Sequence, residues 1–309
     1  MPRLLPLFAL LVMVVLPWVM DDYQIYLLTL TVIWSILALS MGLVLGYVGQ
    51  INLGQIAFVA IAAYVSTLLR QKLGISFWVA APVALASVVA LAALVGVITL
   101  RLRGPYFVLV MLALAEIVRL IVANWQEMTN GPLGLRDIAP PEPLFGVGFD
   151  SKSGFYYLSL AVLAASLAAL VRLVKSRTGR MLVAVREDEV LAEFTGIAVM
   201  RQKVIGLCIS AFVAGLGGLL LAPFLTVLSP SQFTLFASVD MMVMVVVGGM
   251  GTLVGPLIGA VFLTYIPEVL SFANHFRPIL MGVVLIVVTL FAPSGLLGLL
   301  RRLQKRRRE

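Results

Sequence analysis

Three charged side chains lie at least four residues from either end of a long apolar run, where charge is rare. Glu116 and Arg119 share the run 105–123, and Asp240 lies in the run 236–270. Residues three positions apart face the same side of a helix, so Glu116 and Arg119 can form an ion pair. Ionisable residues in membrane helices are costly, usually paired and turned inward, and they often line transport pathways. Glu116, Arg119 and Asp240 are therefore candidates for a pathway or gate. The alternative for the Glu116–Arg119 pair is a structural bridge near the outer end of its helix. Asp240, which we expect near the outer start of its span, has the same two interpretations.

Two further groups of residues mark the breaks between apolar runs. Gln50, Asn52 and Gln55 give the run 53–69 a polar start, where they could contact a substrate or cap a broken helix. Small residues four apart allow two helices to approach closely. The glycines with this spacing are Gly42 and Gly46 in one run and Gly251, Gly255 and Gly259 in another. We expect these glycines to serve helix packing.

The motifs of common enzymes are absent from the sequence. There is no G-x-x-x-x-G-K-[ST] loop for nucleotide phosphates, no H-E-x-x-H and no G-x-S-x-G. The single cysteine, Cys208, and the single histidine, His275, make a metal site improbable. We expect a chain that is not an enzyme and holds no cofactor, so any ATP would be bound by partner subunits.

The composition requires an apolar solvent. Hydrophobic residues make up 62% of the chain and charged residues 12%, against about 25% charged in ordinary soluble domains. The apolar runs are continuous and close to the length of a membrane helix, whereas barrel strands alternate in period two. We therefore predict an all-α polytopic membrane protein of about ten helices. The clear spans are 4–20, 25–47, 53–69, 77–100, 105–123, 155–174, 204–226 and 277–293.

Positive charge sets the orientation, because cytoplasmic segments of membrane proteins are rich in Lys and Arg. The segment 172–203 and the tail 301–309 are both basic, so an even number of crossings must separate them. The run 236–270 then crosses twice, or enters and leaves on one side. Two crossings give ten spans with both termini cytoplasmic. The proline-rich loop 124–154 is then external, and residues 1–300 form a single transmembrane domain with a basic cytoplasmic tail.

Two other features have simpler explanations than they first suggest. The net charge of +8 follows from this orientation and does not indicate nucleic acid. The run 4–20 resembles a signal peptide, but no small-residue cleavage site follows it, and we expect a retained first span.

The longest cytoplasmic segment, 175–203, predicts a short amphipathic helix over Arg180–Thr195. Met181, Val185 and Phe194 could share one apolar face, and Gly196 with Ile197 fits a helix end. Such a helix could receive force from a soluble partner; the alternative is an ordinary surface helix. The candidate coupling residues are Arg180, Arg186, Glu187, Asp188, Glu189, Glu193 and Gly196.

Several segments together resemble a known family. They are Gly46-Tyr47-Val48-Gly49-Gln50-Ile51-Asn52-Leu53-Gly54-Gln55, Arg101-Leu102-Arg103-Gly104-Pro105-Tyr106-Phe107, Ala115-Glu116-Ile117-Val118-Arg119, Gly179-Arg180 with Ala184-Val185-Arg186-Glu187-Asp188-Glu189, and Val246-Val247-Gly248-Gly249-Met250-Gly251-Thr252 with Gly255-Pro256. In this order, over about 25–295, they resemble the permeases of branched-chain amino acid ABC transporters, and the LivM-type branch in particular. In one departure from the general importer coupling motif, Val190 and Leu191 follow Glu189 where that motif has two alanines.

The resemblance implies a subunit of the bacterial inner membrane that forms half of a translocation pathway. Its expected partners are a LivH-type permease, two cytoplasmic ABC ATPases, an external or periplasmic substrate-binding protein and membrane lipid. The segment 175–203 would be the loop that docks on an ATPase. Alternatives are a permease of the same family for urea, amides or other amino acids, an ion-coupled secondary carrier using Glu116 or Asp240, and a membrane scaffold without transport activity.

Overall fold

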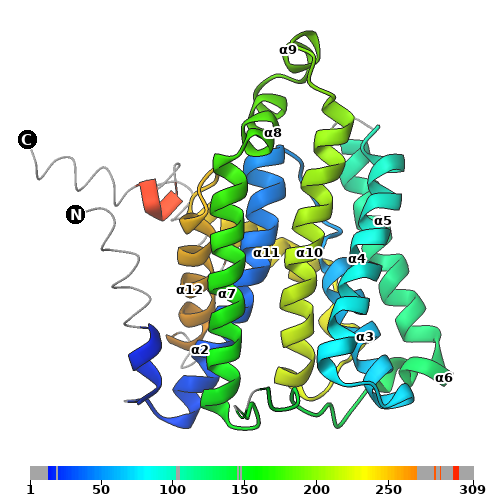
Figure 1. The fold of residues 1–309 in the computed structure, drawn as a ribbon, viewed down its shortest axis with the longest axis vertical. Helices are drawn as coiled ribbons and strands as arrows, with labels where there is room; N and C mark the ends of the chain where they lie inside the picture. Colours follow the sequence, from blue (N-terminus) through cyan, green and yellow to red (C-terminus); the bar gives the residue numbers. More distant parts are fainter. Residues whose placement is uncertain are drawn as a thin grey trace, which may run out of the picture.

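The computed structural model describes residues 13–18, 20–101, 105–144, 146, 148–269, 282, 286 and 295–298. These residues form a helical bundle in which no β-strand occurs (Figure 1). The elements are η1 (Leu16–Trp18), α2 (Asp22–Leu43), η2 (Val44–Val48), α3 (Gln55–Leu73), α4 (Phe77–Thr99), α5 (Pro105–Asn124), α6 (Gln126–Thr129), η3 (Gly131–Leu133), α7 (Lys152–Lys175), α8 (Arg177–Glu187), α9 (Glu189–Phe194), α10 (Val199–Leu225), η4 (Pro230–Gln232), α11 (Leu235–Gly248) and α12 (Val254–Val269).

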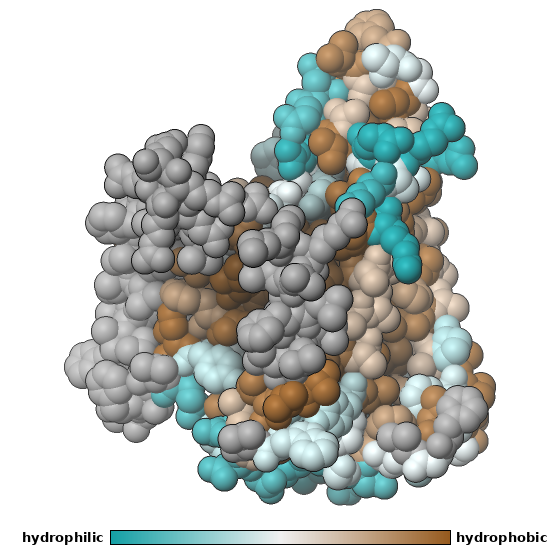
Figure 2. Space-filling model, turned by 60° about the vertical axis from the view of Figure 1, so that its left-hand side comes forward, coloured by the Kyte–Doolittle hydropathy of each residue, from teal (hydrophilic) through white to brown (hydrophobic). Residues whose placement is uncertain are grey.

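The helices have the length and composition of membrane spans. Seven segments of the described chain are long and apolar enough to cross a bilayer, and α12 contains a shorter apolar helix. Figure 2 shows the result on the surface, a hydrophobic band between hydrophilic ends. The predicted all-α membrane architecture is confirmed. The tail 301–309 and most residues of the predicted spans 4–20 and 277–293 lie outside the described residues.

The bundle has a basic end and an opposite end. At the basic end α7 finishes, α8 and α9 project beyond the other helices, and α10 begins (Figure 1). Arg172, Lys175, Arg177, Arg180 and Arg201 lie there and are exposed. The opposite end carries the start of α2, the α3–α4 turn and the loop that precedes α7. By the positive-inside rule, the basic end is the one expected to face the cytoplasm.

After α10 the chain reaches the basic end through α11 and returns to the opposite end through α12. The turn between them meets the basic end of α2, because a Cβ on Gly46 would lie 3.1 Å from the Gly251 backbone nitrogen. The last turn of α12 reaches the opposite end, where the Tyr23 hydroxyl donates to Glu268 Oε1 at 2.6 Å. Between the end of α10 and the end of α12, the chain therefore returns to the end of the bundle from which it starts.

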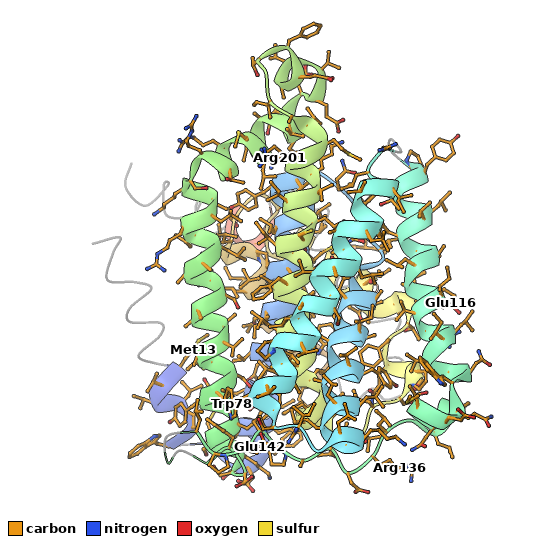
Figure 3. The ribbon with its side chains drawn as sticks, turned by 45° about the vertical axis from the view of Figure 1, so that its right-hand side comes forward. Met13, Trp78, Glu116, Arg136, Glu142 and Arg201 are labelled. Carbon is orange, nitrogen blue, oxygen red and sulfur yellow. The ribbon has the colours of Figure 1, made fainter. Side chains whose placement is uncertain are left out.

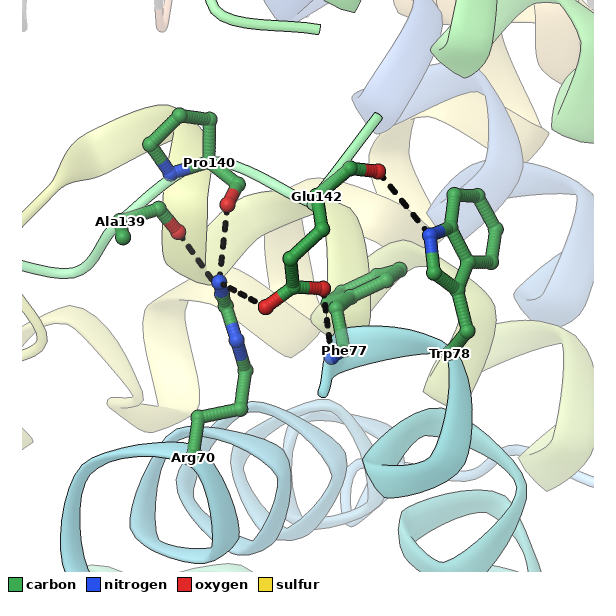
Figure 4. Close-up of polar contacts among 6 residues, drawn as sticks. All are labelled: Arg70, Phe77, Trp78, Ala139, Pro140 and Glu142. Carbon is green, nitrogen blue, oxygen red and sulfur yellow. Dashed lines mark hydrogen bonds and ion pairs between the residues drawn. The ribbon is translucent and has the colours of Figure 1, made fainter. Parts of the chain in front are cut away.

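The loop between α6 and α7 is fastened to the α3–α4 turn (Figure 4). Arg70 donates to the Ala139 and Pro140 carbonyls at 2.7 and 2.8 Å and pairs with Glu142 at 3.2 Å. The Glu142 carboxylate accepts from the Phe77 backbone N–H at 2.7 Å, at the start of α4. Burial opposes ionisation of Glu142, but the Phe77 N–H and the Arg70 charge outweigh it and lower its pKa below the usual 4.5.

Candidate functional site

A group of buried polar side chains connects four elements where the chain turns from η2 into α3. The group, called the polar junction below, consists of Ser40, Asn52, Gln55, Ser210 and Ser238, each fully buried. Gln55 Nε2 donates to Ser40 Oγ at 3.0 Å and to Ser210 Oγ at 2.8 Å. Asn52 Nδ2 donates to Gln55 Oε1 at 2.7 Å. One side chain of α3 is therefore tied to α2, to α10 and to the connection from η2.

The polar junction satisfies the backbone at the start of α3. The first N–H groups of a helix have no partner within it. Here Asn52 Oδ1 accepts from the Gly54 N–H at 2.9 Å, and Ser238 Oγ on α11 accepts from the Ile56 N–H at 3.1 Å. Asn52 therefore holds the backbone at the turn into α3, and Gln55 ties the first turn of α3 to α2 and α10. The third candidate, Gln50, is half-buried and lies before these contacts.

Glu116 and Arg119 form the ion pair that their spacing allows, with Arg119 Nε donating to Glu116 Oε2 at 2.9 Å. The pair does not face the bundle interior as expected. The side chains of Glu116 and Arg119 are 46% and 28% exposed, and Figure 3 shows Glu116 at the edge of the bundle formed by α5. The exposed side chains of the neighbouring helix α4 are all apolar, for example Val83 and Leu94.

Asp240 lies deeper in the bundle than expected, because it is not near the outer start of its span. Ser238, two residues before it, is bonded to Ile56 in the first turn of α3. The rest of α3 covers about 25 Å from there to the opposite end, at about 1.5 Å per residue. Asp240 is exposed on the same side of α11 as Phe236, which is 75% exposed. The expectation fails because α11 begins only at Leu235, after a non-helical stretch that η4 interrupts.

The predicted single helix over 180–195 is wrong, because the chain forms two helices, α8 and α9. Asp188 stands between them with extended backbone, and its Oδ1 accepts from the Val190 and Leu191 N–H groups at 2.9 and 3.0 Å. A carboxylate in this position caps the second helix and ends the first. The predicted stop at Gly196 is correct. Gly196 has a φ of +83°, and the Ile197 N–H donates to the Ala192 carbonyl at 3.1 Å.

Breaking the helix also separates the predicted apolar face. Val185 is buried in α8, whereas Phe194 in α9 is 85% exposed. Phe194 instead joins Val190 and Leu191, which are 57% and 62% exposed. These three exposed apolar side chains of α9 are called the apolar knob below. Helix α9 lies at the tip of the molecule (Figure 1). The candidate coupling residues did not include them, although their one- and four-residue spacing in a polar segment was a usable signal.

Helices α8 and α9 are together called the docking unit, after the role that the resemblance implies for the segment 175–203. The charged residues of these two helices have different surroundings. Arg186 donates through Nη1 to the Gly46 carbonyl and pairs with Glu187, so it points back toward the membrane helices. Glu189 pairs with Lys203 of α10, which is buried. Arg180 and Glu193 are exposed. Only some of the candidate coupling residues therefore face outward.

The five candidate packing glycines lie at close approaches. A Cβ on Gly42 would come 2.7 Å from Pro256 Cγ, and one on Gly259 would overlap the Met244 carbonyl. Gly255 lies against the Gly249 carbonyl, and Gly46 lies against Gly251. Gly42 of α2 thus meets the beginning of α12, and Gly46 of η2 meets the α11–α12 turn. Gly255 of α12 meets the same turn, and Gly259 meets α11. Within the described residues, no group of three or more His, Cys, Asp or Glu side chains could hold a metal ion.

Within the described chain, seven long apolar helices in one bundle, with two short helices projecting from one end, define a multi-pass membrane protein. The chain belongs to the family described as branched-chain amino acid transport system / permease component, which it matches over residues 23–292. It is 33% identical over 96% of its length, and 75% of the relative's, to the high-affinity branched-chain amino acid transport system permease protein LivM of Escherichia coli K12.

Two other relatives support the same assignment. The corresponding LivM protein of Salmonella typhimurium is 34% identical, again over 96% of this chain and 75% of the relative. The permease protein LivH of Escherichia coli K12 is 26% identical over 87% of this chain and 92% of the relative. No solved structure matches the chain. The relatives are permease proteins of a transport system, which are not enzymes.

Proposed function

We propose that this chain is one permease subunit of an ATP-driven importer of branched-chain amino acids in a bacterial inner membrane. The observation that carries the proposal is the apolar knob of Val190, Leu191 and Phe194 on the docking unit. A short helix that presents apolar anchors beyond the membrane fits a groove on a soluble partner. Because the sequence has no nucleotide loop, that partner is the cytoplasmic ATPase, present in two copies.

The exposed face of α5 supports a second membrane subunit. A charged pair turned to lipid is costly, so the side of α5 that carries Glu116 and Arg119 should meet protein or a water-filled path. The apolar exposed face of α4 is suited to lipid. We therefore propose that α5 faces a LivH-type permease, with the translocation path between the two subunits. The loop between α6 and α7, which Arg70 and Glu142 hold to the α3–α4 turn at the opposite end, is where an external substrate-binding protein would approach.

The docking proposal is tested by purifying the tagged chain from native membranes. We expect an ATPase to co-purify, identified by peptides that contain a G-x-x-x-x-G-K-[ST] sequence. Leu191→Ala and Phe194→Ala should each reduce its recovery at least about fivefold, because buried apolar anchors dominate interfaces. Leu73→Ala, which truncates a 67% exposed side chain at the opposite end, is the control and should leave recovery unchanged.

Transport in proteoliposomes separates the proposed function from its alternatives. Leucine uptake should require ATP and the binding protein. Uptake driven by an ion gradient without ATP would instead indicate a secondary carrier. ATP-dependent uptake of urea or an amide, with none of leucine, isoleucine or valine, would keep the importer but reject the branched-chain substrate.

A further inference from the structure

Arg186 is a charged residue of the docking unit whose main contact lies in the membrane part of the protein. It occupies the last turn of α8, and its Nη1 donates to the backbone carbonyl of Gly46 in η2. Its other terminal nitrogen pairs with Glu187, and only 34% of its side chain is exposed. The contact joins residues that are 140 positions apart in the sequence.

The element that Arg186 contacts is an unusual one. Residues Val44–Val48 form a π-helical turn that ends α2, and π turns are rare and frequent at functional sites. Gly49 follows with a φ of +76°, and a Cβ there would overlap the Arg186 side chain. Gly46 also lies against Gly251, whose own Cβ would stand 3.6 Å from Arg186 Nη1. The end of α2, the end of α8 and the α11–α12 turn therefore meet around one guanidinium group.

A second link holds the docking unit to another membrane helix. The Lys203 side chain of α10 is 6% exposed and pairs with Glu189 of α9. The docking unit is thus connected to α2 through Arg186 and to α10 through Lys203. These are the two helices that supply Ser40 and Ser210 to Gln55 in the polar junction. A continuous set of polar contacts and helices runs from the docking unit to the start of α3.

From this geometry we infer that Arg186 is a positioning residue that transmits movement of the docking unit to η2 and the start of α3. The inference rests on the proposed function and assigns Arg186 a role in coupling instead of in ATPase binding. A hydrogen bond from a charged guanidinium to a carbonyl is stronger than a hydrogen bond between neutral groups. Displacing α8 would therefore pull on the Gly46 carbonyl, and the π turn is the element whose hydrogen-bond register can change in response.

The test uses the assembled transporter, with its ATPase subunits and binding protein, in proteoliposomes. Leucine uptake and ATP hydrolysis are measured together. For Arg186→Ala we expect normal recovery of the ATPase subunits and basal hydrolysis near wild type. Uptake per ATP hydrolysed should fall about tenfold, the size expected when one hydrogen bond to a charged group is lost. Arg186→Lys retains a cationic donor and should restore part of the ratio.

The control is Arg201→Ala, which removes an exposed positive charge from the end of α10 that also carries Lys203 (Figure 3). This variant should keep the wild-type ratio of uptake to ATP hydrolysed. Gly49→Ala provides an independent variant, since it disturbs the same contact from η2, and it should also lower uptake per ATP.

A wild-type ratio in Arg186→Ala overturns the inference. If that variant does not fold, wild-type ratios in both Arg186→Lys and Gly49→Ala overturn it. Loss of the ATPase from the Arg186→Ala complex would instead assign Arg186 to docking, and failure of the wild-type chain to bind any ATPase would overturn the proposed function itself.

Discussion

Replacing Gln55 by alanine should destabilise the protein by removing the centre of the polar junction. The Gln55 side chain is fully buried and makes three hydrogen bonds of 3.0 Å or less, to Ser40, Ser210 and Asn52. Hydrogen bonds between membrane helices contribute about 0.6 kcal/mol each on average. The Asn52 amide would also lose its buried acceptor, which costs about 1 kcal/mol or more. We expect Gln55→Ala to lower the free energy of unfolding by about 3 kcal/mol.

The assay is reversible unfolding of the purified chain in mixed micelles, followed by tryptophan fluorescence. Gln50→Ala is the matched control. It removes the same type of side chain five residues earlier, where it is half-buried, and we expect a change within about 0.5 kcal/mol. Equal losses for Gln55→Ala and Gln50→Ala would refute the reasoning, since the buried hydrogen bonds would then contribute nothing beyond an ordinary surface substitution.

Three other predictions address separate parts of the structure. The lowered pKa of Glu142 means that its ionised form stabilises the folded state at pH values above the usual 4.5, and this contribution is lost as the pH falls through the lower folded pKa. Trp78 donates to the Glu142 carbonyl at 3.0 Å, so its fluorescence should report release of the loop on acidification. Glu142→Gln should abolish this pH dependence. Gly259→Ala should prevent folding, because the added Cβ would overlap the Met244 carbonyl. Size-exclusion chromatography should then show aggregated protein. The control is Gly148→Ala, whose added Cβ would have its nearest neighbouring atom 3.9 Å away and which should give monodisperse protein. Arg119→Gln should reduce leucine uptake more than the double variant Glu116→Gln/Arg119→Gln, because the single change leaves the Glu116 carboxylate without its partner in a membrane helix. Equal losses in the two variants would show that pairing of the two charges is not what matters.

Local sequence signals predicted much of the architecture. The apolar runs 77–100 and 105–123 correspond to α4 and α5 within one residue at each end, because a membrane helix needs a continuous apolar stretch of nearly fixed length. Gly249 and Gly251 are a sequence signal for the turn between α11 and α12. Both have positive φ values in the structure, a conformation that favours glycine. The pairing of Glu116 with Arg119 required only their three-residue spacing.

The docking unit shows where local reasoning failed. The segment 180–195 has good helix formers throughout, so propensity predicted one helix. Asp188 competes with that helix, because its side chain can satisfy the next backbone N–H groups in an extended conformation. The folded chain with the break at Asp188 also contains the Glu189–Lys203 and Arg186–Gly46 contacts. These contacts join residues 14 and 140 positions apart, so local propensity does not include them. The exposure of Phe194 follows from this break.

The sequence by itself determined that this chain is a multi-pass helical protein, which end is basic, and to which permease family it belongs. These properties depend on composition, on the positions of charge and on ordered local motifs. Only the tertiary structure decided which polar residues meet. It brought Gln55 to Ser40 and Ser210, turned the Glu116–Arg119 pair outward, and directed Arg186 to the carbonyl of Gly46. Such contacts form between distant segments, and the geometry that selects them exists only once the helices have packed against one another.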